Sequence, residues 1–300
     1  MNIKPGKIKI LLHGEPYHTK VFCEQLENYK KGIFEPKYFE NLNPDISYDK
    51  FDLFHLISPP LPVIKKLRKF KKPVIYHWIG TDVYRLLNDS LIKKISKKYL
   101  LKSSGVINLV VSENLKDELN SLGITSEILP LVKLKFINEI PPLPAKFTVL
   151  AYIPEKSWDY YNGDIILKLA ENFPDIDFHI VASGERYINL KNVFMHGFIE
   201  DLTPFYKSCS ALIRLTVHDG LPKMVLEALS FGRQVLWSGA LPHCFKTATL
   251  EECINVLVIL KENPEVNSDG KKYVEKNFNP EIISEDYYNF CKRILAEYSE

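Results

Sequence analysis

Apolar runs alternate with amphipathic segments along most of the chain, and this alternation limits the folds that it can adopt. Apolar runs at 52–58 and 73–79 each end in a polar break, and residues 62–70 between them have helical spacing of apolar positions. Short apolar runs of this kind are typical of strands buried on both faces. The pattern predicts an α/β protein in which helices cover both faces of a parallel sheet.

The alternation occurs twice, on either side of a proline-rich segment. Residues 139–146, EIPPLPAK, have the composition of a linker, and strand and helix patterns begin again at 147–153 and 164–172. A chain of 300 residues is long enough for two ordinary hydrophobic cores. We therefore expect two doubly wound, Rossmann-like domains.

The cysteines and the apolar runs indicate a cytoplasmic protein. Five cysteines are scattered along the chain without a CxxC pair, which is typical of a reducing compartment. No stretch approaches the roughly 20 uninterrupted apolar residues of a membrane-spanning helix. The N-terminus, MNIKPGKIKILLHG, lacks the small-residue cleavage site of a secretory signal.

Charge is divided unevenly between the two halves. Residues 1–143 hold 23 Lys and Arg against 15 Asp and Glu, whereas residues 144–300 hold 16 against 22. Dense basic runs at 65–72 and 93–98 are explained either by solvated helix faces or by peripheral contact with an anionic membrane or a phosphate-bearing acceptor. Because no aromatic-interleaved basic motif is present, we expect no nucleic-acid partner.

The segment 210–237, SALIRLTVHDGLPKMVLEALSFGRQVLW, combines a strand, a tight loop and a helix. An apolar run at 211–217 predicts the strand, and the helix is expected to begin near Pro222 and to close at Gly232. The loop therefore follows the carboxyl end of a strand, where the N–H groups of a helix start favour a bound anion.

Two acids in this segment, Asp219 and Glu227, lie eight residues apart. The spacing places one acid on the loop and the other two turns along the helix, facing one ligand. The segment resembles the signature of retaining glycosyltransferases of family 4, in which two glutamates stand eight positions apart around a glycine. Here Asp219 replaces the first glutamate, which keeps the charge but shortens its reach.

The resemblance implies a GT-B fold of two Rossmann-like domains facing a cleft. It implies an acceptor-side domain at 1–140, a nucleotide-sugar-binding domain at 141–283 and a C-terminal helix at 284–300 packed on the first domain. The implied reaction is retaining transfer of a hexose from a nucleoside-diphosphate sugar to a glycan or lipid-linked acceptor. A non-catalytic sugar-nucleotide-binding relative and a nucleotide-sugar epimerase on the same fold are alternatives.

The resemblance also assigns roles to single residues. It implies that Glu227 accepts hydrogen bonds from the ribose hydroxyls and Asp219 from the sugar hydroxyls; the apolar context LEAL offers Glu227 no local partner. An IGTD loop that ends in Asp82 and follows His77 resembles an acceptor-side loop of the family. The alternatives are a core histidine for His77 and an N-cap of a helix at 83–87 for Asp82.

Stabilisation of the departing diphosphate is the largest chemical need of such a transfer. Family members place an arginine and a lysine after the first strand of the second domain; Lys156 corresponds to one of them, and Asn162 occupies the position of the lysine. Arg214 either supplies the missing charge or forms a structural salt bridge with Asp219 or Glu200.

The remaining expected contacts to the nucleotide sugar are His218, Gly220, Leu221, Lys223, Gly184 and Gly197. The two glycines at 184 and 197 allow close backbone approach. The sequence has no DxD pair on a convincing loop and no cluster of His, Cys, Asp and Glu at metal-binding spacing. We therefore expect transfer without a metal or another cofactor.

Overall fold

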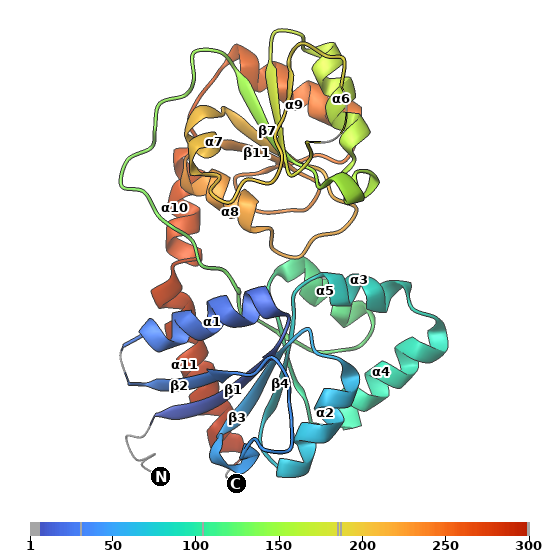
Figure 1. Ribbon diagram of the computed structural model, residues 1–300, viewed down its shortest axis with the longest axis vertical. Helices are drawn as coiled ribbons and strands as arrows, with labels where there is room; N and C mark the ends of the chain where they lie inside the picture. The colour runs from blue at the N-terminus through green and yellow to red at the C-terminus, as the bar shows by residue number, and fades with distance from the viewer. Residues whose placement is uncertain (1–6, 31, 104, 185, 187, 299–300) are drawn as a thin grey trace. The chain divides into compact units, whose positions relative to one another are not determined.

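The computed structural model describes residues 7–298 except 31, 104, 185 and 187. It divides the chain into two compact units, which are unit 1 (Met1–Lys133 with Phe278–Glu300) and unit 2 (Leu134–Asn277). Each unit holds a six-stranded sheet (Figure 1). All strand pairs in the described residues are parallel. The predicted α/β class with two Rossmann-like units is thus confirmed.

Unit 1 has the strand order β2-β1-β3-β4-β5-β6. Its elements are β1 (Ile8–Gly14), α1 (Pro16–Asn28), β2 (Phe34–Tyr38), η1 (Tyr48–Lys50), β3 (Leu53–Ile57), α2 (Leu61–Leu67), η2 (Arg68–Phe70), β4 (Val74–Trp78), α3 (Thr81–Asn88), α4 (Leu91–Ser103), β5 (Ile107–Val110), α5 (Glu113–Ser121), β6 (Glu127–Ile128) and α11 (Pro280–Glu297).

Adjacent residues of β3 show how helices cover both faces of this sheet. The ring of His55 lies against Phe22 of α1 and Tyr287 of α11, with ring centroids 5.1 and 5.3 Å apart. Phe54, which points to the opposite face because side chains alternate along a strand, contacts Phe70 at the end of η2 at 6.1 Å. The continuous burial of β3 and β4 follows from this double cover.

The C-terminal helix α11 packs against α1 within unit 1. The Gln25 side-chain amide donates to Ser284 Oγ at 3.1 Å and to the Pro280 carbonyl at 3.2 Å. The Tyr29 hydroxyl donates to the carboxylate of Glu285. These contacts join residues about 255 positions apart in the sequence, so the end of the chain belongs to the same unit as its beginning.

Among the described residues, no helix has both the length and the apolarity needed to cross a bilayer.

Unit 2 has the strand order β12-β11-β10-β7-β8-β9. Its elements are β7 (Thr148–Tyr152), η3 (Glu155–Ser157), η4 (Asp159–Tyr161), α6 (Gly163–Asn172), β8 (Asp177–Val181), β9 (Val193–Met195), α7 (Thr203–Ser208), β10 (Ala211–Arg214), α8 (Lys223–Ser230), β11 (Gln234–Trp237), β12 (Phe245–Lys246), α9 (Leu250–Glu262) and α10 (Ser268–Asn277). One core cluster joins apolar residues of β7, α6, β8, β10 and α9.

The helix α8 ends where the sequence predicts. Gly232 has φ +67°, a left-handed conformation that glycine adopts without a steric penalty. Its N–H bonds to the Leu229 carbonyl at 2.8 Å, and the N–H of Arg233 bonds to the Ala228 carbonyl at 2.9 Å. This pair of bonds is the Schellman motif, which satisfies the last carbonyls of the helix and turns the chain directly into β11.

Candidate functional site

The order of strands in unit 2 defines where a ligand is expected to bind. The chain leaves β7 toward β8 on one side and returns through β10 on the other, so the direction of winding reverses between β7 and β10. Ligands of open α/β sheets bind outside the carboxyl ends of the strands at such a reversal. The loop that contains Asp219 follows β10 and therefore lies at this position.

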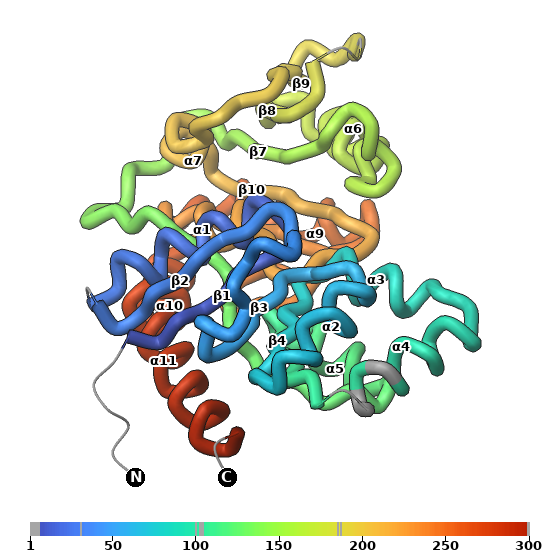
Figure 2. The backbone as a smooth tube through the Cα atoms, turned by 60° about the horizontal axis from the view of Figure 1, so that its bottom comes forward, coloured from blue at the N-terminus to red at the C-terminus, as the bar shows by residue number. Residues whose placement is uncertain are grey.

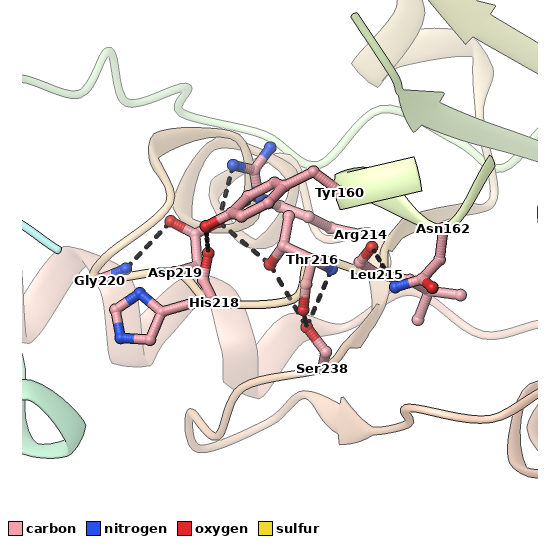
Figure 3. A network of polar contacts seen from close by, with 9 residues as sticks. All are labelled: Tyr160, Asn162, Arg214, Leu215, Thr216, His218, Asp219, Gly220 and Ser238. Carbon is pink, nitrogen blue, oxygen red and sulfur yellow. Dashed lines mark hydrogen bonds and ion pairs between the residues drawn. The ribbon is translucent and has the colours of Figure 1, made fainter. Parts of the chain in front are cut away.

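The loops that follow β7 and β10 are hydrogen-bonded to each other. The hydroxyl of Tyr160 donates to the His218 carbonyl at 2.6 Å, and the N–H of Val217 donates to the Tyr160 carbonyl at 3.0 Å. The side-chain amide of Asn162 donates to the Leu215 carbonyl at 3.2 Å. Figure 3 shows the side-chain contacts of Tyr160 and Asn162 with the loop. They fix the backbone that carries the candidate residues.

A third strand end holds the same loop from the other side. Ser238, which follows β11, accepts from the Thr216 N–H at 3.0 Å and donates to the Thr216 carbonyl at 2.8 Å (Figure 3). Thr216 and Val217 bond to neighbouring loops, and β10 ends at Arg214, so the strand is three residues shorter than the predicted run 211–217. The sequence interpretation missed Tyr160 and Ser238, although both follow strand ends as the predicted residues do.

Asp219 forms a salt bridge with Arg214, which was one of the two predicted alternatives. Arg214 Nε and Nη2 each lie 2.7 Å from Asp219 Oδ2, and the Gly220 N–H donates to Oδ1 at 3.0 Å (Figure 3). The two side chains are only 11% and 19% exposed. Burial lowers the pKa of Arg214, but the Asp219 carboxylate and Tyr161 outweigh burial and leave this pKa raised.

Glu227 has two partners, and one of them, Lys223, corrects the expectation that no local partner is available. Its Oε2 accepts from the Tyr206 hydroxyl at 2.9 Å, and its Oε1 lies 3.1 Å from Lys223 Nζ. Tyr206 comes from α7, whereas Lys223 stands one turn earlier on α8. Burial and the adjacent carboxylate raise the pKa of Tyr206 well above its ordinary value, so this hydroxyl remains a donor at neutral pH.

The start of α8 offers backbone donors beside the acids. Pro222 is the N-cap residue, and the N–H of Val225 is bonded to its carbonyl at 3.0 Å. The N–H groups of Lys223 and Met224, one residue and two residues into the helix, have no acceptor within the helix. Helix geometry directs such groups outward, where they attract an anion. The neighbouring Leu221 is half-buried.

The positively charged side chains that were predicted to contact the diphosphate differ in exposure and in their partners. Lys156 is exposed on η3, and Lys223 is partly exposed beside Glu227. Asn162 has a left-handed conformation with φ +49°, and its bond to the Leu215 carbonyl gives it a structural role where the resemblance leads one to expect a lysine. Within the part of the chain that the structure describes, no group of three or more His, Cys, Asp and Glu side chains could hold a metal ion.

The structure places Gly184 and Gly197 next to each other. A Cβ at position 184 would lie 3.1 Å from the Gly197 Cα, so close backbone packing explains this glycine. A Cβ at position 197 would find no atom within 4 Å. His218 is half-buried, and Figure 3 shows its ring pointing away from the Arg214 guanidinium.

His77 lies in the core of unit 1, which corrects its assignment to the site. The side chain is fully buried, with Nε2 2.8 Å from the Leu129 carbonyl and Nδ1 3.0 Å from His55 Nε2. Burial lowers the pKa of His77 to about 3, although the bond to Leu129 opposes this shift. Both ring nitrogens are therefore occupied, and the ring is a satisfied core residue.

Asp82 holds the loop that follows β4 and does not cap a helix at 83–87. The N-cap residue of α3 is Gly80, one residue before the helix. Asp82 Oδ1 accepts from the N–H groups of Ile79, Gly80 and Val83 at 3.1, 3.0 and 3.0 Å. Burial raises the pKa of Asp82, although these backbone donors oppose the shift.

Comparisons with known proteins show which proteins this chain resembles. No protein-family model matches the chain. An uncharacterized glycosyltransferase of Haemophilus influenzae is 29% identical over 156 residues, which is 43% of this chain and 42% of that protein. The match thus spans less than half of the length of this relative.

Solved structures match over nearly the whole chain. They include Anabaena Alr3699/HepE in complex with UDP-glucose (TM-score 0.67, 14% identity, 95% of this chain and 99% of that one). Sucrose-phosphate synthase from Thermosynechococcus elongatus gives a TM-score of 0.72 at 13% identity over 97% of this chain and 100% of that one. At these identities the likeness shows the fold, which is the GT-B arrangement of two Rossmann-like domains.

Proposed function

We propose that the protein is a retaining glycosyltransferase of family 4 type. It transfers a hexose from a nucleoside-diphosphate sugar to a glycan or lipid-linked acceptor, in the cytoplasm and without a metal. The observation that carries the proposal is a pair of acids, Asp219 and Glu227, on the loop and helix that follow β10 at the reversal of strand order. The GT-B fold, shared with a structure that contains UDP-glucose, supports it.

The diphosphate of the donor binds at the start of α8. The N–H groups of the first turn and the ammonium of Lys223 meet its negative charge, and they stabilise the additional charge that develops on the leaving group. Arg214 has five N–H donors in a planar fork, so it can hold Asp219 and still donate to a phosphate oxygen.

The two acids bind the hydroxyl groups of the donor. Glu227 accepts from the ribose hydroxyls, and the Tyr206 hydroxyl keeps the carboxylate in one orientation. Asp219 accepts from the sugar hydroxyls, and its salt bridge with Arg214 holds the carboxylate in place. Carboxylates serve both purposes because an ionised carboxylate accepts hydrogen bonds and donates none.

Unit 1 binds the acceptor and contacts an anionic membrane surface. The basic excess of residues 1–143 supports this assignment, because a lipid-linked acceptor resides at such a surface.

A panel of UDP-, GDP- and ADP-sugars tests the proposal by thermal shift and donor consumption. The NMR signal of the anomeric proton in the product then reports whether configuration is retained. Glu227→Ala is expected to weaken donor binding by about tenfold or more, because it removes a charged hydrogen-bond acceptor. Glu262→Ala, an exposed acid at the end of α9, is the matched control. Unchanged donor binding by Glu227→Ala would mean that the site lies elsewhere.

Binding without turnover is a second candidate, because Asn162 fills the family's lysine position with a structural hydrogen bond. This candidate predicts a thermal shift with one donor but no donor consumption with any acceptor. A product without a new glycosidic bond would instead indicate an epimerase.

A further inference from the structure

The helix α4 has an exposed apolar stripe on its outer face. Leu91, Ile92, Ile95 and Tyr99 are 72%, 78%, 59% and 74% exposed. At 3.6 residues per turn these four positions fall within a stripe about 100° wide. A surface helix of a globular protein normally turns such a stripe toward the core, so the orientation of α4 is the reverse of the usual one.

Contacts of α4 with the rest of unit 1 confirm this orientation. Leu101 is only 2% exposed, and Lys97 Nζ lies 2.6 Å from Asp89 Oδ2, which precedes the helix. Lys98 lies close enough to Gly123 that a Cβ at that glycine would be 2.6 Å from the ammonium. The side that faces unit 1 therefore includes Leu101 and the stems of two lysines, while the aliphatic and aromatic stripe faces outward.

Charge distinguishes among the surfaces that could cover this stripe. The α4 sequence LIKKISKKYLLKS holds five lysines, and no acid occurs from Ser90 to Ser112. A second copy of the same helix would bring two strongly basic segments together without a compensating acid. An anionic lipid surface instead attracts the net positive charge of the segment, while its acyl region accepts the apolar side chains.

A second basic segment lies on the same side of unit 1. Figures 1 and 2 both place α2, which leads into the basic run 65–72, on the side that carries α4. Lys65, Lys69 and Lys71 of this run are exposed, so the run adds positive charge on this side of unit 1. An exposed apolar stripe next to basic segments is typical of surfaces that contact an anionic membrane interface.

We propose that α4 is the membrane-docking element of unit 1 and inserts Leu91, Ile92, Ile95 and Tyr99 into the interface of an anionic bilayer. The assignment rests on the membrane contact proposed above, and it is independent of the transfer reaction. The exposed Lys93 of α4 and the exposed Lys65, Lys69 and Lys71 of the run 65–72 bind lipid phosphates at the same surface.

Co-sedimentation of the full chain with vesicles tests the assignment, in the absence of donor and acceptor. Vesicles of phosphatidylcholine alone are compared with vesicles that also contain phosphatidylglycerol. The protein is expected to bind the anionic vesicles and to be released by high salt. Ile92→Ser/Ile95→Ser is expected to reduce binding by about tenfold or more.

The matched control is Val258→Ser/Ile259→Ser on α9, where the two side chains are 40% and 57% exposed. This variant is expected to bind vesicles as the wild type does. Both double variants replace exposed side chains, and their thermal unfolding midpoints are expected to match that of the wild type.

Two results would overturn the assignment. One is vesicle binding that Ile92→Ser/Ile95→Ser leaves unchanged. The other is a wild-type dimer in analytical ultracentrifugation that the same substitutions convert to a monomer, which would identify a second copy as the occupant. Donor consumption with a soluble acceptor is expected to be equal in the variant and the wild type. A failed donor panel with intact vesicle binding would therefore refute only the proposed transfer.

Discussion

A buried row of hydrogen bonds in unit 1 predicts that acid destabilises this unit. His77 Nε2 lies 2.8 Å from the Leu129 carbonyl, which accepts only, so Nε2 carries the proton. His77 Nδ1 then accepts from His55 Nε2 at 3.0 Å, and His55 Nδ1 accepts from the Tyr287 hydroxyl at 2.8 Å. Each ring has one donor and one acceptor, so both histidines are neutral.

Burial sets the direction of the pH dependence. It lowers the pKa of His55 well below 6.5 and that of His77 to about 3. The unfolded chain therefore binds more protons than the folded one at any pH between the folded pKa values and about 6.5. Stability is fully present above pH 6.5 and falls as the pH decreases below it.

The magnitude follows from the same linkage. Two rings that stay neutral in the folded state together reduce the free energy of unfolding by about 4 kcal/mol between pH 7 and pH 5. Hydrogen exchange of the buried amides of β3 and β4 at the two pH values reports this loss for unit 1 alone.

One variant and one control test whether the buried histidine rings cause the pH dependence. His55→Gln removes one titrating ring and is expected to reduce the pH dependence by about half. His243→Asn replaces an exposed histidine of unit 2 and is expected to leave it unchanged. An equal pH dependence in the wild type and His55→Gln would show that the buried rings do not cause it.

Two further predictions concern unit 2. Asp219→Asn leaves the nearly buried Arg214 guanidinium without its charge partner. Urea unfolding is therefore expected to show that the free energy of unfolding falls by about 3 kcal/mol. A variant as stable as the wild type would mean that solvent already screens the pair. Gly232→Ala places a methyl group 2.6 Å from Ile140 Cγ2 at φ +67°, so the same measurement is expected to show a loss of about 1–2 kcal/mol. Gly197→Ala, whose methyl group meets open space, is the control for stability, and its donor affinity tests the proposed nucleotide contact separately.

Local signals in the sequence account for most of the fold. The apolar runs around β3, β4 and β11 predict strands because burial on both faces demands continuous apolar residues. Gly232 predicts the end of α8 because it adopts a left-handed conformation without strain. The alternation of these elements allows few topologies, so the parallel sheets follow from sequence order alone.

The sequence predicted where in the fold the candidate site lies, but not all of the contacts of its residues. Residues after strand ends gather at one edge of a parallel sheet, which places Asp219 in the loop that follows β10. The distant partner of Glu227 was not predictable, because Tyr206 precedes it by 21 residues and reaches it only when α7 packs beside α8.

His77 shows what tertiary structure alone decides. Its sequence context, PVIYHWI, places it near the end of a strand, which suits a site residue and a core residue equally. The packing of α1 and α11 over one face of the sheet buries His55, and the row of hydrogen bonds from Tyr287 to Leu129 then fills both nitrogens of His77. The sequence by itself determined strands, helices and strand-end loops, because these depend on local periodicity and backbone preference. The tertiary structure decided which side chains are buried and which charged groups form ion pairs, because these depend on residues brought together from distant parts of the chain.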